Sequence, residues 1–230
     1  MSRIYSFLLK NIIMPIADKV MNTKLIHFYK KINKMQSWSA AEIENWQDIK
    51  LQKLVQHAYK NTKYYQELFD KNNIDYREIK SRSDLKRIPI LTKSKIRQNF
   101  DKLIPTNINN IYFFNASTGG SSGEPLKFLM DLKSWSFMNA STIYHWENSE
   151  YKYGDKYVAL GSTSLFVNKR PSLKHKIYYI LKNKVGLNGI NMSNEVCEKY
   201  YNLIKNKNIN YIYGYASAIY IFSKFIIDYN

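Results

Sequence analysis

The segment Tyr-Val-Ala-Leu-Gly at residues 157–161 is an uncharged, mostly apolar run that ends in glycine. Such a run, bounded by turn residues, predicts a buried strand. Two further uncharged segments that we expect to be strands follow it, and a helical pattern comes after each of the three. The strands are expected at 157–161, 187–191 and 211–213, and the helices at 172–181, after a cap at Ser193, and at 216–227. This alternation predicts an α/β fold with a mainly parallel sheet that is covered by helices.

A segment rich in glycine and serine lies upstream of these strands. Residues 111–114 and 126–130 are strand-like, and the seven residues 117–123 between them are all small. Small side chains bury little apolar surface, so we expect a strand, an exposed loop and a second strand. A helix over 134–146 is expected to follow.

The first hundred residues show helical patterns. Ser39 and Glu42 have the spacing of a capping box, in which each side chain bonds to the backbone N–H of the other residue, so a helix is expected at 40–60. We therefore divide the chain into a helical N-terminal region, 1–109, and an α/β region, 110–230, within the same structural domain.

Composition excludes several classes of protein. The chain has 230 residues, of which 45% are hydrophobic and 23% charged, with a single cysteine. This excludes a disordered chain, a collagen and a disulfide scaffold. Cys197 has no cysteine or histidine companion at metal-binding spacing, so a zinc site is not expected. As a single cysteine it cannot form a disulfide within the chain, and we expect the protein in the reducing cytoplasm.

Basic residues outnumber acidic ones. There are 35 Lys and Arg against 18 Asp and Glu, a net charge of +17, which favours polyanionic partners. They are spread along the chain without a dense run, however, so no specific nucleic-acid site is predicted. The first helix places Lys10 and Lys19 near Phe7 and Ile12. It either packs on the body of the protein or associates weakly with an anionic membrane surface.

The small-residue loop indicates phosphate binding, because turned-in backbone N–H groups and hydroxyls form an anion-binding nest. A Walker A loop is excluded, since Glu124 and Pro125 follow Gly123 where that motif requires Lys and Ser or Thr. The loop also matches the G-x-S-x-G pattern of hydrolases, with Ser121 as nucleophile. That pattern requires a helix next, whereas the sequence after Pro125 favours a strand.

The loop resembles the phosphate-binding signature of the adenylate-forming superfamily, which includes the acyl-coenzyme A synthetases. The most similar branch contains phenylacetate-coenzyme A ligases and CapK-like proteins of capsular polysaccharide biosynthesis. Matches to this branch occur in family order along the chain. They are Trp46 with residues 53–59 and 64–65, residues 85–93, Trp146 with residues 154–161, and residues 213–218.

The resemblance implies a ligase that uses ATP and Mg²⁺ to convert a carboxylic acid into an acyl-adenylate and then transfers the acyl group to coenzyme A. The implied phosphate-binding residues are Thr118, Gly119, Gly120, Ser121, Ser122, Gly123 and Lys127, and the implied substrate-binding residues are Tyr213, Gly214, Tyr215 and Ser217. The wider superfamily commonly has Lys at the position of Glu124, so Lys127 is the nearest candidate to neutralise the phosphates.

The family's later motifs, which include the magnesium-binding Glu and a catalytic Lys, would follow Asn230. The resemblance therefore implies the N-terminal half of such an enzyme, as a fragment, a truncated product or the partner of a separately encoded C-terminal half. We expect this half to be inactive alone. The alternative interpretation is a basic protein that binds nucleic acid or a membrane surface and has a non-catalytic glycine loop.

Overall fold

The computed structural model describes residues 3–118, 125–161, 173, 177 and 180–229. The chain divides into two compact units. We call Asn22–Ala140 the hairpin unit, and Met1–Met21 together with Ser141–Asn230 the sheet unit. These units do not follow the expected division at 109/110, and the grouping of both regions into one structural domain stays a prediction.

Helices make up most of the hairpin unit. α4 (Ala40–Asn61) begins at the predicted capping box: Ser39 Oγ accepts a hydrogen bond from the Glu42 N–H (3.3 Å), and the Ser39 N–H donates to Glu42 Oε2 (2.7 Å). The other elements are α3 (Leu25–Met35), α5 (Lys63–Lys71), α6 (Lys93–Gln98), α7 (Phe100–Leu103) and 3-10 turns at Tyr76–Glu78, Arg82–Arg87 and Ile108–Asn110. Their apolar core contains Val55, Phe69, Ile74 and Ile79.

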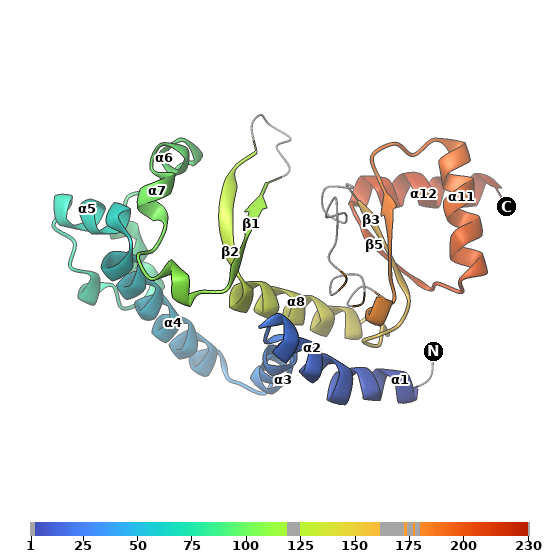
Figure 1. Ribbon diagram of the computed structural model, residues 1–230, viewed down its shortest axis with the longest axis horizontal. Helices are drawn as coiled ribbons and strands as arrows, with labels where there is room; N and C mark the ends of the chain where they lie inside the picture. Colours follow the sequence, from blue (N-terminus) through green and yellow to red (C-terminus); the bar gives the residue numbers. More distant parts are fainter. Residues whose placement is uncertain (1–2, 119–124, 162–172, 174–176, 178–179, 230) are drawn as a thin grey trace. The chain divides into compact units, whose positions relative to one another are not determined.

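Two antiparallel strands form the hairpin, β1 (Phe113–Ser117) and β2 (Lys127–Asp131) (Figure 1). The two predicted strands are confirmed, and the loop residues 119–124 lie outside the described residues. β1 begins two residues later than expected because the Ile111 N–H still bonds to the Ile108 carbonyl (3.0 Å), which prolongs the preceding turn. α8 (Leu132–Glu147) follows β2 at once, since Asp131 Oδ1 accepts from the first free N–H groups of the helix.

The sheet unit contains a three-stranded parallel sheet. β3 (Tyr157–Gly161) is central, with β4 (Lys184–Asn188) on one side and β5 (Tyr211–Gly214) on the other. α11 (Asn194–Asn206), capped by Ser193 as predicted, connects β4 to β5, and α12 (Ala216–Tyr229) follows β5. The predicted α/β fold with a parallel sheet is confirmed.

β4 lies three residues earlier than the predicted strand at 187–191. Asn183 adopts a left-handed conformation (φ 51°) just before it, and Asn188 Oδ1 accepts the Ile190 N–H (3.0 Å), which turns the chain out of the sheet. The strand therefore ends at the second residue of the predicted range. In the predicted helix 172–181, positions 173, 177, 180 and 181 are helical and the others lie outside the described residues.

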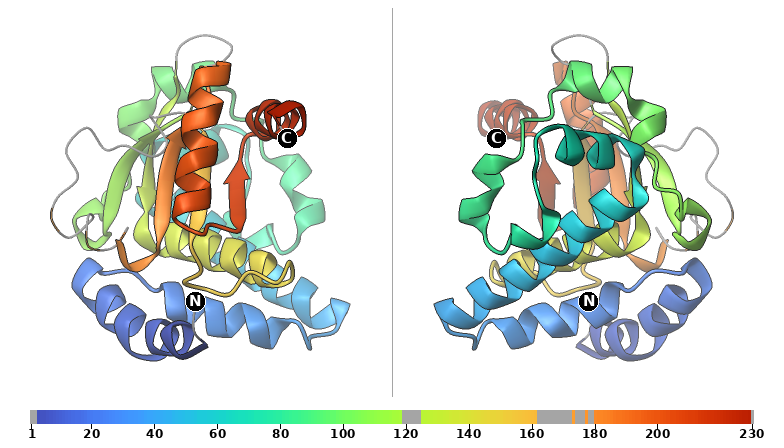
Figure 2. Two further views of the ribbon diagram at one scale, coloured as in Figure 1. Left: turned by 90° about the vertical axis from the view of Figure 1, so that its right-hand side faces the viewer. Right: turned by 90° about the vertical axis from the view of Figure 1, so that its left-hand side faces the viewer.

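The two faces of the sheet are covered differently. On one face Val158 and Leu160 pack with Cys197 of α11 and with Ala218 and Phe222 of α12, all buried. Figure 2 shows α11 lying across this face. Cys197 is thus the small buried apolar residue that its sequence position indicates. The other face carries tyrosines, which are described with the site below.

The N-terminal helix packs on the sheet unit. It runs through α1 (Arg3–Leu8), a π-helical turn (Leu9–Ile13) and α2 (Met14–Met21). The Tyr5 hydroxyl donates to the Leu181 carbonyl (2.8 Å), Ser6 Oγ donates to the Tyr153 carbonyl (2.8 Å), and Lys10 pairs with Glu147 (2.5 Å). None of the described helices has both the length and the apolar character needed to cross a bilayer.

Candidate functional site

The neck of the hairpin holds the two described residues of the predicted phosphate site. The Thr118 N–H donates to the Leu126 carbonyl, and the Leu126 N–H donates to Thr118 Oγ1, both at 3.0 Å. Thr118 therefore closes the base of the loop. Among the described residues its hydroxyl hydrogen has no acceptor, and a hydroxyl can accept and donate at once.

Lys127 lies one residue beyond this neck. It is the first residue of β2, is exposed, and stands opposite Ser117. Because side chains alternate between the faces of a hairpin, Lys127 and Thr118 point to opposite faces. The two residues are therefore adjacent in the ladder, but their side chains do not point toward a common site. Gly119, Gly120, Ser121, Ser122 and Gly123 lie outside the described residues.

The other predicted residues gather at the carboxyl end of the parallel sheet. Tyr213 and Gly214 end β5, and Tyr215 precedes α12. Ser217 is the second residue of α12, so it does not occupy the N-cap position. Ligands of open α/β sheets bind outside the carboxyl ends of the strands. The structure places this group at such an end, and its role in substrate binding stays a prediction. These residues belong to the sheet unit, whereas Thr118 and Lys127 belong to the hairpin unit.

Glycine is required at this end of the sheet. A Cβ on Gly214 would lie 2.1 Å from the Leu160 carbonyl oxygen, which also accepts the Tyr215 N–H at 3.0 Å. On the opposite side of β3, the Gly189 N–H donates to the Gly161 carbonyl (2.8 Å), and a Cβ on Gly189 would lie 2.9 Å from Ala218 Cβ. Backbone therefore approaches backbone on both sides of the central strand, which fixes where the following loops begin.

The side chains of Tyr213 and Tyr215, on either side of Gly214, are exposed, with exposed fractions of 51% and 45%. The Tyr213 ring packs on Trp146 with centroids 4.9 Å apart. Within the part of the chain that the structure describes, its hydroxyl bonds to no other residue. A half-exposed ring with an uncommitted hydroxyl can both pack on and hydrogen-bond to a ligand.

The Tyr213 ring belongs to an aromatic cluster. Trp146 of α8 contacts Tyr151, Tyr157 and Tyr213 with centroid distances of 4.9–5.3 Å, and Tyr151 contacts Tyr211 at 5.2 Å. Burial raises the pKa of the Tyr151 hydroxyl far above its usual value. Trp146 therefore covers the tyrosine-bearing face of the sheet.

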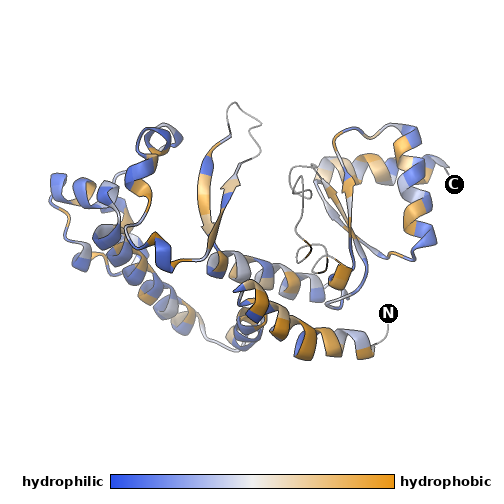
Figure 3. Ribbon diagram, in the orientation of Figure 1, coloured by the Kyte–Doolittle hydropathy of each residue, from blue (hydrophilic) through white to orange (hydrophobic). Residues whose placement is uncertain are grey.

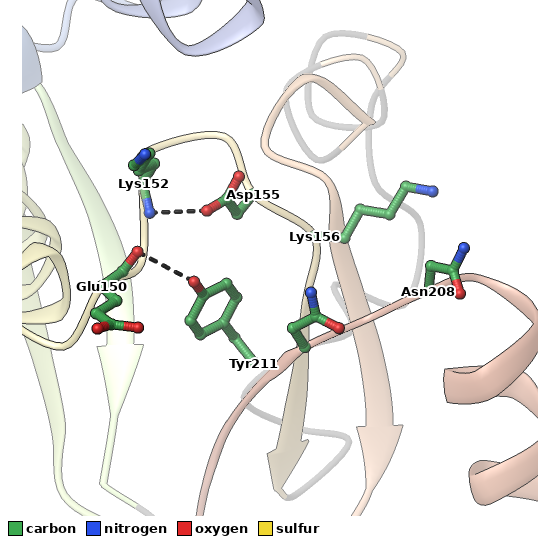
Figure 4. Close-up of a pocket in the computed structure, with 7 residues that line it drawn as sticks. Glu150, Lys152, Asp155, Lys156, Asn208 and Tyr211 are labelled. Carbon is green, nitrogen blue, oxygen red and sulfur yellow. Dashed lines mark hydrogen bonds between the residues drawn. The ribbon is translucent and has the colours of Figure 1, made fainter. Parts of the chain in front are cut away.

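A pocket of about 700 Å³ opens at the opposite, amino end of the strands (Figure 4). Three of its polar side chains bond to the backbone of neighbouring loops: Tyr211 to the Glu150 carbonyl (3.0 Å), Lys156 to the Lys207 carbonyl (3.1 Å), and Asp155 to the Lys152 N–H (2.8 Å). Desolvation, helped by the carboxylates of Asp155 and Glu150, raises the pKa of the Tyr211 hydroxyl. These bonds tie the loops together, and the pocket is on the side of the sheet where α/β enzymes do not bind their ligands.

A buried amine also lies at the amino end. Lys182 precedes β4, and only 8% of it is exposed. Burial, reinforced by the charge of Lys184 and opposed by Asp18, lowers its pKa to about 7.

The sequence interpretation missed Gly161 and Gly189, although glycine at or just after each strand was the available signal. The pocket and the buried amine had no signal of this kind, because their residues come from separate loops with no motif. Among the described residues, no group of three or more His, Cys, Asp or Glu is arranged to hold a metal ion.

Solved structures with a similar fold are those of 2-hydroxyisobutyryl-CoA ligase (HCL) in complex with 2-HIB-AMP and CoA. The open conformation matches with a TM-score of 0.53 and the thioesterification state with 0.52, each at 14% identity. The matches cover 84% of this chain and 45% and 41% of the ligase chains. The fold is thus that of part of an adenylate-forming CoA ligase.

A curated relative comes from the branch that the sequence resembles. The chain is 23% identical over 207 residues to Protein CapK of Staphylococcus aureus, which covers 89% of this chain and 44% of CapK. The resemblance to the adenylate-forming superfamily is thereby confirmed. The chain spans less than half the length of the relatives it matches, and no protein-family model matches it.

Proposed function

We propose that this chain supplies the phosphate-binding loop and part of the substrate site of an adenylate-forming ligase. The reaction uses ATP to convert a carboxylic acid into an acyl-adenylate with release of pyrophosphate, and then transfers the acyl group to coenzyme A. The observation that carries the proposal is the fold similarity to a ligase whose structures contain an acyl-AMP and CoA.

The hairpin would hold the phosphates of ATP. Residues 119–123 offer backbone N–H groups and hydroxyls, Thr118 closes the base of the loop, and the exposed Lys127 adds positive charge beside it. Positive charge and N–H donors stabilise the negative charge that develops on a leaving pyrophosphate. Mg²⁺ would contribute further neutralisation when bound, and we assign its ligands to no described residue.

The carboxyl end of the sheet would hold the acyl part. Tyr213 and Tyr215 are exposed there, and Gly214 allows the backbone to pass close to β3 without a side chain. The carboxylic acid would thus contact aromatic rings and hydroxyls, a surface suited to an amphipathic acid.

ATP binding by Lys127→Ala tests the role of the hairpin. Loss of a charge-assisted contact to phosphate is expected to weaken ATP binding about tenfold in a calorimetric titration. Lys133→Ala is the matched control, because Lys133 is also exposed and lies six residues further along the same unit. Equal affinities for ATP in the two variants would contradict the assignment of Lys127.

Pyrophosphate release tests the reaction. A panel of aryl and aliphatic carboxylates is offered with ATP to this chain alone and to a longer chain that spans the full length of CapK. We expect carboxylate-dependent release only from the longer chain, because charge stabilisation by several groups acts as a unit. Strong release by the 230-residue chain alone would contradict the proposed division of labour, and none from either would contradict the proposed reaction.

A further inference from the structure

The N-terminal helix of the sheet unit is rich in apolar residues (Figure 3), and six of them form an exposed apolar stripe. The apolar stripe consists of Ile4, Phe7, Leu8, Ile12, Ile16 and Val20, with exposed fractions of 69%, 63%, 39%, 49%, 60% and 53%. Five of its members are spaced by four residues over the whole helix. Single exposed apolar residues are ordinary, but an aligned series is typical of a binding surface.

The π-helical turn keeps this stripe straight. Residues four apart in an α-helix advance by about 40° more than one full turn, so a four-residue spacing would wind around a purely α-helical rod. The wider turn at Leu9–Ile13 reverses part of that rotation midway. Ile4, Ile12 and Val20 consequently stay on the solvent side, while Leu9, Met14 and Asp18 are buried on the opposite side.

The charges around the stripe are one-sided. Residues 3–21 contain one carboxylate, Asp18, and it is buried, while Lys19 is exposed next to Val20. The sheet unit as a whole has 15 Lys and Arg against seven Asp and Glu, a net charge of +8. A surface that presents apolar side chains within a positive field is complementary to an anionic one.

We propose that the apolar stripe lies in the plane of an anionic lipid bilayer and attaches the protein to that surface. The stripe extends for about 24 Å along one side of a helix, which fits a flat, deformable layer better than a pocket-shaped partner. An interfacial helix buries its apolar face at the headgroup boundary, and anionic lipids add electrostatic attraction. The helix is already held to the sheet unit through Tyr5, Ser6 and Lys10, so docking requires no refolding.

Vesicle sedimentation tests the proposal without any need for catalysis. The chain is expected to sediment with vesicles of phosphatidylglycerol and phosphatidylcholine (1:1), and about tenfold less with pure phosphatidylcholine. The double variant Ile12→Gln, Ile16→Gln keeps the charge and removes two apolar side chains, and is expected to lower binding to the anionic vesicles at least about tenfold. Lys19→Gln is expected to lower it about threefold on anionic vesicles only.

Leu54→Gln is the matched control. Leu54 is 65% exposed on α4, outside the stripe, and its replacement is expected to leave vesicle binding unchanged. Circular dichroism verifies that each variant is folded. Equal vesicle binding by the double variant and the control would overturn the proposal. The proposal would also be overturned if the unmodified chain did not bind vesicles but formed a dimer, and the double variant were a monomer. The stripe would then contact a second copy of the chain.

Discussion

The carboxyl and amino ends of the β4-β3-β5 sheet are held together by different contacts. At the carboxyl end, backbone meets backbone at Gly214 and Gly189, and the tyrosines that leave it are exposed. At the amino end, side chains bond to the backbone of the loops around a pocket, and Lys182 is buried before β4.

The difference distinguishes a hollow in the surface from the proposed substrate site. The amino-end pocket has volume, but Tyr211, Lys156 and Asp155 already bond to the protein's own backbone. The hydroxyl of Tyr213 at the carboxyl end is uncommitted among the described residues. A polar group that has no partner in the protein is the one that gains most from a ligand.

The largest expected effect is at Gly214. Gly214→Ala would place a methyl group 2.1 Å from the Leu160 carbonyl oxygen, which is backbone and cannot move aside without separating β3 from β5. We expect a loss of about 3 kcal/mol in the free energy of unfolding, measured by urea denaturation.

An alanine substitution at the amino end is the control for this variant. Asn210 is exposed and immediately precedes β5, so Asn210→Ala is expected to change stability by no more than about 0.5 kcal/mol. Similar losses for both variants would show that the two ends do not differ in the way described.

The next effect depends on pH and concerns Lys182. Its pKa is about 7 in the folded protein and near 10.5 in the unfolded chain, so between these values the unfolded chain binds a proton that the folded protein does not. The free energy of unfolding therefore rises with pH in this window. Below pH 7 both states are protonated, and Lys182 adds no further pH dependence. From pH 7 to pH 9 we expect a rise of about 2 kcal/mol.

Lys182→Met should remove most of that rise, as followed by urea denaturation at several pH values. Lys199→Met, at an exposed position of α11, is expected to keep it. A rise that is undiminished in Lys182→Met would refute the assignment to this amine.

Local patterns predicted the parts of the fold that local chemistry determines. The Ser39 and Glu42 box fixed the start of α4, and the Ser193 cap fixed the start of α11. β4 was predicted three residues late because the prediction ran the strand through Asn188 and Gly189, a dipeptide typical of turns, and Asn188 ends the strand through its side chain. Strand ends depend on such single hydrogen bonds, which hydrophobic patterning does not report.

The site was predictable to the extent that it lies on continuous sequence. The substrate-binding role of residues 213–217 was inferred from the family resemblance and stays a prediction, whereas their place at the carboxyl end follows from parallel topology. The amino-end pocket joins the loops at 150–156 and 208–211, and Lys182 interacts electrostatically with Asp18 of the N-terminal helix and with Lys184 of β4. No property of those separate segments specifies that they meet.

The smallest expected effect on stability gives the most direct comparison of the two ends of the sheet. β5 has a tyrosine at each end, so the same Tyr→Phe substitution can be made at both. Tyr211→Phe removes a hydroxyl that donates to the Glu150 carbonyl, and is expected to lower the free energy of unfolding by about 1 kcal/mol without affecting catalysis. Tyr213→Phe removes a hydroxyl with no described partner, so stability should change by about 0.5 kcal/mol or less. In a longer chain that shows carboxylate-dependent pyrophosphate release, Tyr213→Phe is instead expected to raise the KM for the carboxylic acid about fivefold, the equivalent of one hydrogen bond. If Tyr211→Phe raised this KM and Tyr213→Phe did not, the substrate would have to be placed at the amino end.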